Sequence, residues 1–184
     1  MQKETFMKNL KKIICLGAVA AFVVMGGLAH AETFKAEVFL ATDKGPGASI
    51  GFVTLTDTPE GLEIKTDLTG LPPGKHGFHV HENGDCGAVE KDGKAMHAAA
   101  AGGHYDPEKT GKHLGPDNGG HLGDLPVLEA AADGSAKVTL LVKKPKAGDF
   151  KDRSIMIHAG GDNYSDEPAL LGGGGARLAC GIIK

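Results

Sequence analysis

Short runs of alternating apolar and polar residues follow one another along most of the chain. Residues 34–40 alternate, residues 49–55 carry Ile50, Phe52 and Val53, and residues 61–68 alternate again. A period of two residues is typical of β-strands with one buried face. Five further strand candidates, bounded by glycine and proline clusters, lie at 76–81, 127–131, 136–142, 154–158 and 178–183. With no convincing helical period, the pattern predicts an all-β antiparallel sandwich or barrel.

Two long stretches interrupt these runs. Residues 84–126 are mostly irregular in pattern, and residues 160–175 are rich in glycine and acidic side chains. Structureless stretches of this length in a compact domain are usually functional loops, disordered segments or wrongly assigned elements. The chain contains 29 glycines, about twice ordinary usage, which agrees with abundant loops.

The composition indicates one soluble domain. Of 184 residues, 41% are apolar and 23% charged, with a formal net charge of −3. Beyond the first dozen residues the basic side chains cluster only at 143–146, which is too short a run to neutralise many phosphates. We therefore expect no nucleic-acid partner.

The first 31 residues have the pattern of a secretory signal peptide. Lysines at 8, 11 and 12 precede an apolar run over 13–28, and Ala29-His30-Ala31 fits a small-x-small cleavage site. Translation could start at Met1 or at Met7. A retained membrane anchor is the alternative, but the apolar run is short for a span. We expect cleavage to leave residues 32–184 as the mature domain, without a membrane partner.

Cleavage would also remove Cys15 and leave Cys86 and Cys180. An exported compartment permits disulfides, so one bridge is the natural inference, with two buried thiols as the alternative. A bridge closing a loop of about 95 residues contributes roughly 4 to 5 kcal/mol in the chain-entropy description.

Nine histidines are the outlying feature of the composition. His79 and His81 would project from one face of a strand and could hold one metal ion, although such a pair is often a surface accident. His113, His121 and Asp124 are ligands of the type that zinc prefers, the alternative being solvated loop residues.

Three more residues extend this set. His104 lies between the two groups, and a deprotonated imidazole can bind metals through both nitrogens. His158 closes an apolar strand and could reach the same place. Arg177, three residues before Cys180, is a candidate guide for an anion, although an isolated arginine is more often a surface ion-pair partner.

Four motifs resemble the copper/zinc superoxide dismutases: His76-Gly77-Phe78-His79-Val80-His81, Gly103-His104-Tyr105-Asp106-Pro107, His121-Leu122-Gly123-Asp124 and Gly175-Ala176-Arg177-Leu178-Ala179-Cys180-Gly181. Their order and spacing match over nearly the whole mature chain, and His158 to Asn163 is similar to the bacterial, periplasmic branch. The resemblance implies a flattened eight-stranded Greek-key β-barrel with two long functional loops, located in the periplasm.

The resemblance also implies roles for individual residues. One copper ion per subunit would be bound by His79, His81, His104 and His158, and one zinc ion by His104, His113, His121 and Asp124. Asp162 would link His79 to His113, His76 would bond backbone, and Cys86 would pair with Cys180. Arg177 and His104 would be catalytic, Arg177 by orienting superoxide. His97 matches no ligand and is interpreted as a loop histidine.

The implied activity is dismutation of superoxide to dioxygen and hydrogen peroxide. Copper would cycle between two oxidation states while His104 leaves it and takes up a proton, and zinc would be structural. The alternatives are a non-enzymatic periplasmic module that sequesters copper and zinc, and a zinc hydrolase. Lys109 and Lys112 are candidates for steering superoxide, and a homodimer is possible.

Overall fold

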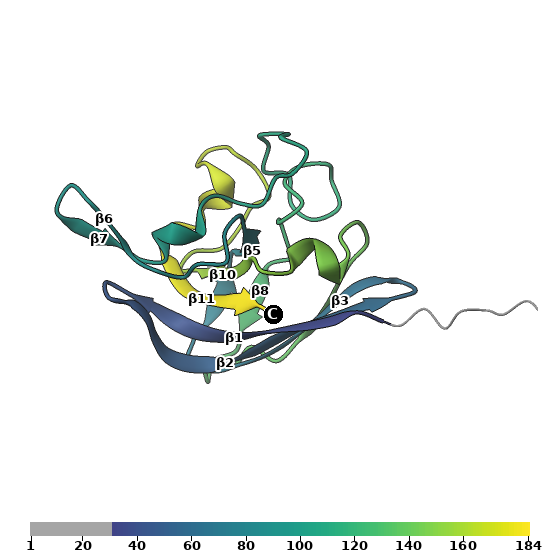
Figure 1. Cartoon of the computed structure of the whole chain (residues 1–184), viewed down its shortest axis with the longest axis horizontal. Coiled ribbons are helices and arrows are strands. Elements are labelled where there is room, and N and C mark those ends of the chain that lie inside the picture. The colour runs from purple at the N-terminus through teal and green to yellow at the C-terminus, as the bar shows by residue number, and fades with distance from the viewer. Residues whose placement is uncertain (1–30) are drawn as a thin grey trace, which may run out of the picture. The chain divides into compact units, whose positions relative to one another are not determined.

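Seven strands form one curled antiparallel sheet in the order β5-β10-β11-β1-β2-β3-β9 in the computed structural model, which describes residues 31–184 (Figure 1). The predicted signal peptide, apart from Ala31, lies outside the described residues. The strands of this sheet are β1 Thr33–Thr42, β2 Gly45–Thr58, β3 Gly61–Leu68, β5 Phe78–His81, β9 Thr139–Val142, β10 Ser154–His158 and β11 Arg177–Ile183. Two-stranded pairs are formed by β4 Gly74–His76 with β8 Leu128–Ala130 and by β6 Val89–Lys91 with β7 Lys94–Met96.

The apolar core lies inside the curled sheet. Alternation along β2 and β3 turns Val53, Leu55, Leu62 and Ile64 inward, where each is fully buried. Figure 1 shows β1, β2 and β3 on one side of this core, with β5, β10 and β11 on the other. The core therefore fixes β5 and β10, and these two strands carry three of the predicted ligands.

The predicted fold class is confirmed, with one strand candidate divided. The chain changes partners at Gly77, so residues 76–81 become β4, paired with β8, and β5, paired with β10. The amide of Gly77 donates to Gly160 O and its carbonyl accepts from the amide of His158. These bonds tie the division point to the start of the second long loop.

The first long loop contains more regular structure than its pattern predicted. It forms the β6–β7 hairpin and the short 3-10 helix η1 Ala99–Ala101, and the second loop contains η3 Leu171–Gly173. A further 3-10 helix, η2 Ala147–Phe150, precedes β10. Figure 1 shows the hairpin extending away from the sheet. All residues of both its strands are exposed, so no apolar alternation marked it in the sequence.

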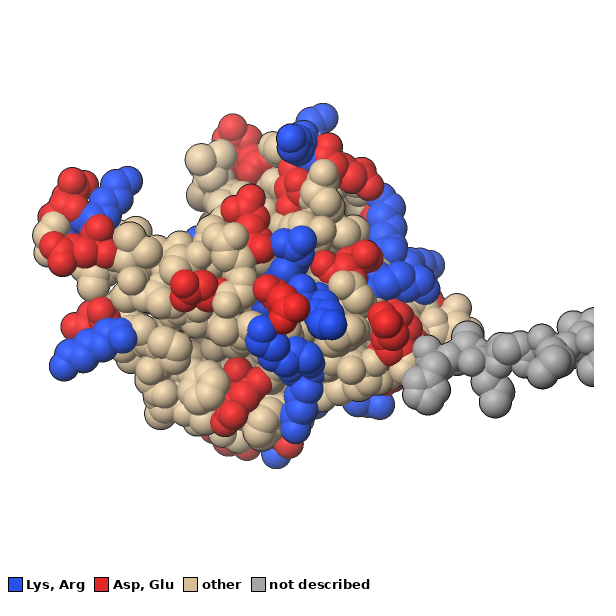
Figure 2. Space-filling model, viewed as in Figure 1, with Lys and Arg blue, Asp and Glu red and all other residues tan. Residues whose placement is uncertain are grey.

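Positive and negative side chains are interspersed over the face shown in Figure 2. Within residues 31–184, no helix combines the length and apolar character needed to cross a membrane.

Candidate metal centre

Four buried histidines converge beside strand β5. His79 and His81 alternate with the core residues Phe78 and Val80, so both imidazoles leave the strand on the face opposite the core. His158 ends the neighbouring strand β10. A ligand nitrogen from each of these histidines and from His104 lies within 4.8 Å of the others. The structure thus brings together the four predicted copper ligands.

The first long loop reaches this group by adding itself to the free edge of β5. The amide of Tyr105 donates to Val80 O at 2.9 Å, and the amide of Val80 donates to Gly123 O at 2.8 Å. Isolated bridges pair His81 with His104 and His79 with Asp124. Gly123 allows this close approach, because a Cβ there would overlap Val80 O. Main-chain pairing with β5 therefore fixes the positions of His104 and Asp124 relative to His79 and His81.

The ring nitrogens that face the centre of the group have no hydrogen-bond partner. They are His79 Nδ1, His81 Nε2, His104 Nε2 and His158 Nε2. Buried polar atoms are normally hydrogen-bonded, so four such unpartnered nitrogens close together indicate a cation-binding site. Copper is well suited to a set of imidazole nitrogens. The residues present therefore fit a copper ion.

A second group lies on the other side of His104. Ligand atoms of His79, His104, His113 and Asp124 lie within 4.8 Å of one another. His121, predicted as a zinc ligand, is outside that set, but its Nδ1 is 3.4 Å from Asp124 Oδ1 and is buried without a hydrogen bond.

Separations among these atoms match a tetrahedral site. His104 Nδ1 lies 3.0 Å from Asp124 Oδ1, and His113 Nδ1 lies 3.0 Å from Asp124 Oδ2. Donor atoms about 2.0 Å from one tetrahedral zinc ion are roughly 3.3 Å apart. His79 is not available to the second group, because its Nδ1 faces the first group and its Nε2 is bonded to Asp162. His121 Nδ1, in contrast, has no hydrogen-bond partner. The donors therefore fit zinc with His121 as the fourth ligand.

Asp162 joins the two groups. His79 Nε2 donates to its Oδ2 at 2.7 Å, and His113 Nε2 donates to its Oδ1 at 2.8 Å. Burial opposes ionisation, but the hydrogen bonds from His113 and His79 hold the pKa of Asp162 well below its ordinary value. Because each histidine donates from Nε2, each keeps an Nδ1 lone pair for a metal.

Gly172 lets the second loop close over this carboxylate. Its φ is +70°, and a Cβ there would overlap Asp162 Oδ1 and approach His113 Nε2 to 2.8 Å. The amide of His113 also donates to Asp166 Oδ2 at 3.0 Å. The glycine-rich, acidic character of this loop is thus explained by what it covers.

Burial keeps the copper-facing histidines neutral. It is the largest cause that lowers the pKa of His104 to about 4 and of His158 to about 3. Burial also acts to lower the pKa of His113, but the carboxylates of Asp124 and Asp162 beside the ring favour its charged form, outweigh burial and raise that pKa to about 9. Neutral imidazoles are the form that binds metals.

We expect the metal-free protein to lose stability as the pH falls from about 6.5 toward 4. Unfolded histidines take up protons near pH 6.5, whereas His104 and His158 in the folded state do so only near 4 and 3. The unfolded state therefore binds more protons in this window. His113, with a folded-state pKa of about 9, opposes the effect only at the top of the window, where the unfolded imidazole is still taking up its proton. Urea unfolding across the window measures it, and a constant midpoint would contradict it.

Arg177 connects the first group of histidines to the chain on either side of η1, which follows the β6–β7 hairpin. Its Nη1 donates to Ala98 O at 2.6 Å and its Nη2 donates to Gly102 O. Gly102 O also accepts from His81 Nδ1 at 2.9 Å. Burial lowers the pKa of Arg177, yet a guanidinium stays charged in proteins. A fixed cation therefore shares a hydrogen-bond acceptor, Gly102 O, with His81 of the first group.

Sequence reasoning missed the carbonyls that orient these rings. Gly102 O and Gly175 O accept from His81 Nδ1 and His158 Nδ1. Every residue has a carbonyl, so no side-chain signal could have identified them.

Comparison with known proteins gives the same result as this geometry. Residues 49–183 match the family described as "Copper/zinc superoxide dismutase (SODC)". The chain belongs to the copper/zinc superoxide dismutase family. "Superoxide dismutase [Cu-Zn]" of Escherichia coli (strain K12) is 53% identical over 168 residues, which are 91% of this chain and 96% of that protein. The enzyme of the same name from Brucella abortus biovar 1 (strain 9-941) is 50% identical over 166 residues, 90% of this chain and 96% of that protein.

Two solved structures resemble the fold closely. The "Cu/Zn superoxide dismutase from Brucella abortus" has a TM-score of 0.81 at 51% identity, covering 83% of this chain and all of that one. The "Monomeric Copper, Zinc Superoxide Dismutase from Salmonella enterica" has a TM-score of 0.74 at 52% identity, covering 84% and 99%. The protein is accordingly a dismutase of superoxide with copper and zinc as cofactors.

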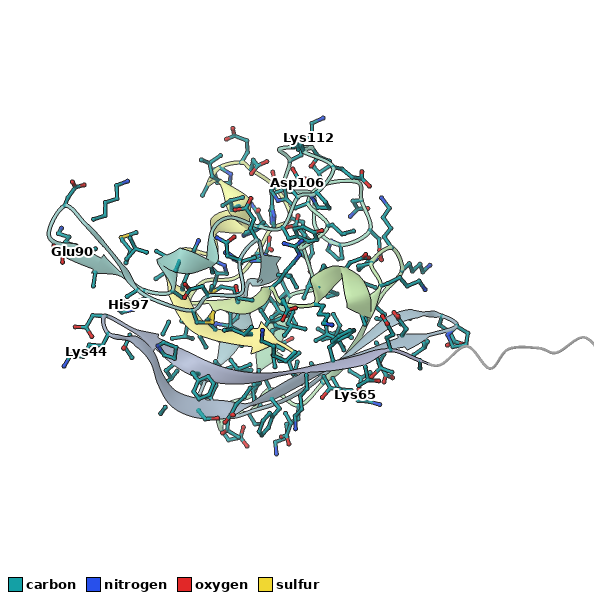
Figure 3. The ribbon with its side chains drawn as sticks, viewed as in Figure 1. Lys44, Lys65, Glu90, His97, Asp106 and Lys112 are labelled. Atoms are coloured by element: carbon teal, nitrogen blue, oxygen red, sulfur yellow. A yellow bond between two sulfur atoms is a disulfide. The ribbon has the colours of Figure 1, made fainter. Side chains whose placement is uncertain are left out.

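The remaining predicted residues are also placed. His76 has Nδ1 2.7 Å from His158 O and Nε2 2.8 Å from Pro72 O, so both nitrogens face backbone rather than the metal groups. Cys86 and Cys180 form a disulfide. Lys109 and Lys112 are exposed, and Figure 3 shows Lys112 on the outer loops. Steering by these lysines stays a prediction.

Proposed function

We propose that His79, His81, His104 and His158 bind copper, and that His104, His113, His121 and Asp124 bind zinc. The observation that carries this assignment is the set of buried, unpartnered nitrogens that point to the two centres. His104 supports its own role as the bridge, because Nε2 belongs to one set and Nδ1 lies beside Asp124 in the other.

Each half of the site has a separate task. Copper supplies the electron exchange with superoxide, because it alternates between two oxidation states and zinc does not. His104 holds or releases a proton at Nε2, which can then protonate the departing peroxide. Asp162 keeps His79 and His113 in the tautomer that presents Nδ1. Asp124, beside His104 Nδ1, would bind zinc together with that ring and so keep the ring in one orientation.

Arg177 draws the anionic substrate toward the copper histidines and orients it. The guanidinium is fixed by two carbonyls and lies beside His81 and His158, whose pKa values it helps to lower. Arg177 also favours an enzyme over a module that sequesters metals. Metal storage needs the metal ligands, but it does not need a positive charge that binds an anionic substrate.

The test is the Arg177→Gln variant, with Arg177→Lys as its matched control. We expect Arg177→Gln to keep both metals but to dismutate superoxide about tenfold more slowly at low ionic strength, and with a weaker salt dependence. Arg177→Lys should recover part of the rate, since it restores the charge. Pulse radiolysis with metal analysis measures both. An unchanged rate in Arg177→Gln would remove the proposed role and favour sequestration.

The location that we propose is the periplasm. Support comes from the signal-peptide pattern of residues 1–31, from the Cys86–Cys180 disulfide and from bacterial relatives of similar length. Disulfides persist in oxidising compartments of this kind. We propose residues 32–184 as the mature enzyme.

Activity does not require a second copy of the chain in this proposal. Every proposed ligand and Arg177 come from one chain. A homodimer would therefore add stability or regulation rather than a missing catalytic residue.

A further inference from the structure

A hollow of about 380 Å³ opens between the end of the β6–β7 hairpin and the chain that leads into β11 at Arg177. Met96 and His97 line one side of it, and Gly175, Ala176 and Arg177 line the other. Figure 3 shows His97 at the base of the hairpin, and Figure 2 shows the hairpin standing off from the body of the molecule.

The floor of this hollow touches the copper group. Gly175 O accepts a hydrogen bond from His158 Nδ1 at 3.2 Å. Arg177 shares Gly102 O with His81 Nδ1. His81 is 1% exposed and His158 is 7% exposed, so an ion arriving from solvent must pass other residues before it meets these nitrogens. One hydrogen bond therefore joins a residue of the hollow, Gly175, to His158, and the shared acceptor Gly102 O joins another, Arg177, to His81.

Met96 and His97 have no structural task that explains them. Met96 is 50% exposed at the end of a hairpin whose strand residues are all exposed, so it does not contribute to the core. His97 is exposed and belongs to neither metal group. A thioether is a soft ligand that favours Cu(I), and imidazole also binds copper. Met96 and His97 are therefore two potential copper donors, adjacent in the chain, that line the same hollow as Gly175 and Arg177.

We propose that Met96 and His97 form an outer Cu(I) site that receives the ion before the four histidines bind it. The proposal rests on the assignment of His79, His81, His104 and His158 as copper ligands. Transfer exchanges ligands without a change in oxidation state: the Met96 sulfur and the His97 nitrogen give way to the unpaired nitrogens of His81 and His158. The site speeds loading and is not part of the dismutation cycle.

Copper uptake by zinc-loaded protein tests this proposal. Cu(I) is presented anaerobically as its bicinchoninate complex, and loss of the chelator's colour gives the uptake rate. We expect Met96→Leu and His97→Gln to slow uptake about tenfold, the lower end of what losing a hydrogen-bond partner of a metal ligand costs in metal affinity, with unchanged final copper content. The matched control is Val89→Ala, because Val89 pairs with Met96 across the hairpin, is 44% exposed and offers no donor.

A second measurement detects the site directly. One equivalent of Ag(I), a redox-inert substitute for Cu(I), is added to fully loaded protein labelled at its methionine methyl carbons. The Met96 resonance should shift in wild type and remain in place in His97→Gln. The outer site would be overturned by any one of three results. Met96→Leu could take up copper at the wild-type rate, Val89→Ala could slow uptake as much as Met96→Leu does, or the Met96 resonance of wild type could stay in place when Ag(I) is added. If wild type fails to take up one copper at all, the copper-ligand assignment fails instead.

Discussion

We expect replacement of His158 with alanine to abolish superoxide dismutation and copper retention while zinc stays bound. His158 contributes one of the four unpaired nitrogens that we propose to bind copper and none of the atoms that we propose to bind zinc. Even partners of metal ligands cost on the order of 10 to 100-fold in metal affinity when removed, so a ligand itself should cost at least the upper figure. Activity should fall to background at copper concentrations that saturate the wild type.

The measurement is metal content and activity after reconstitution with zinc alone and with both metals. Wild type should be active only with copper, and His158→Ala with neither. Retained zinc shows that the variant is folded, and His158→Gln provides a second replacement of closer size. The matched control is His76→Gln: His76 is buried next to His158, but both its nitrogens face carbonyls. This control should melt earlier yet keep both metals. Full activity in both His158 variants would contradict the copper assignment.

Removing the disulfide has the largest expected effect on stability. Cys86 and Cys180 are separated by 94 residues, and a loop of that size corresponds to about 4 to 5 kcal/mol of the free energy of unfolding. For a domain of this length the melting temperature should fall by roughly 10 to 15 °C. The metal-free Cys86→Ser/Cys180→Ser protein should show this loss in urea unfolding.

The bond also holds the loop that carries Ala98 and Gly102, the carbonyls to which Arg177 donates. We therefore expect the loaded double variant to lose activity beyond what its unfolded fraction explains. Dithiothreitol is the control, since it should destabilise wild type and leave the double variant unchanged. If the free energy of unfolding of the metal-free double variant differed from that of wild type by less than about 1 kcal/mol, the expected stabilisation by the disulfide would be contradicted.

The strand pattern alone was sufficient to predict the class of fold. Period-two alternation follows from a sheet with one buried face, and the boundaries 61–68 and 154–158 were predicted to the residue. The same period placed His79 and His81 on one face, where they join a single group. Motif order and spacing then identified the family and, through it, the enzymatic activity.

Other features could not be predicted because they depend on partners distant in the chain. The division of residues 76–81 follows from bonds between Gly77 and residues more than eighty positions later. The exposed β6–β7 hairpin has no buried face and so no apolar signal.

The sequence by itself determined which potential ligands are present. It also determined on which face of each strand they lie, because side chains alternate between the two faces along a strand. Only the tertiary structure decided which nitrogen of each histidine remains free. His79 donates Nε2 to Asp162, 83 residues away, and His81 donates Nδ1 to Gly102 O. A ring's free nitrogen is set by the partner of the other one, and folding alone supplies that partner.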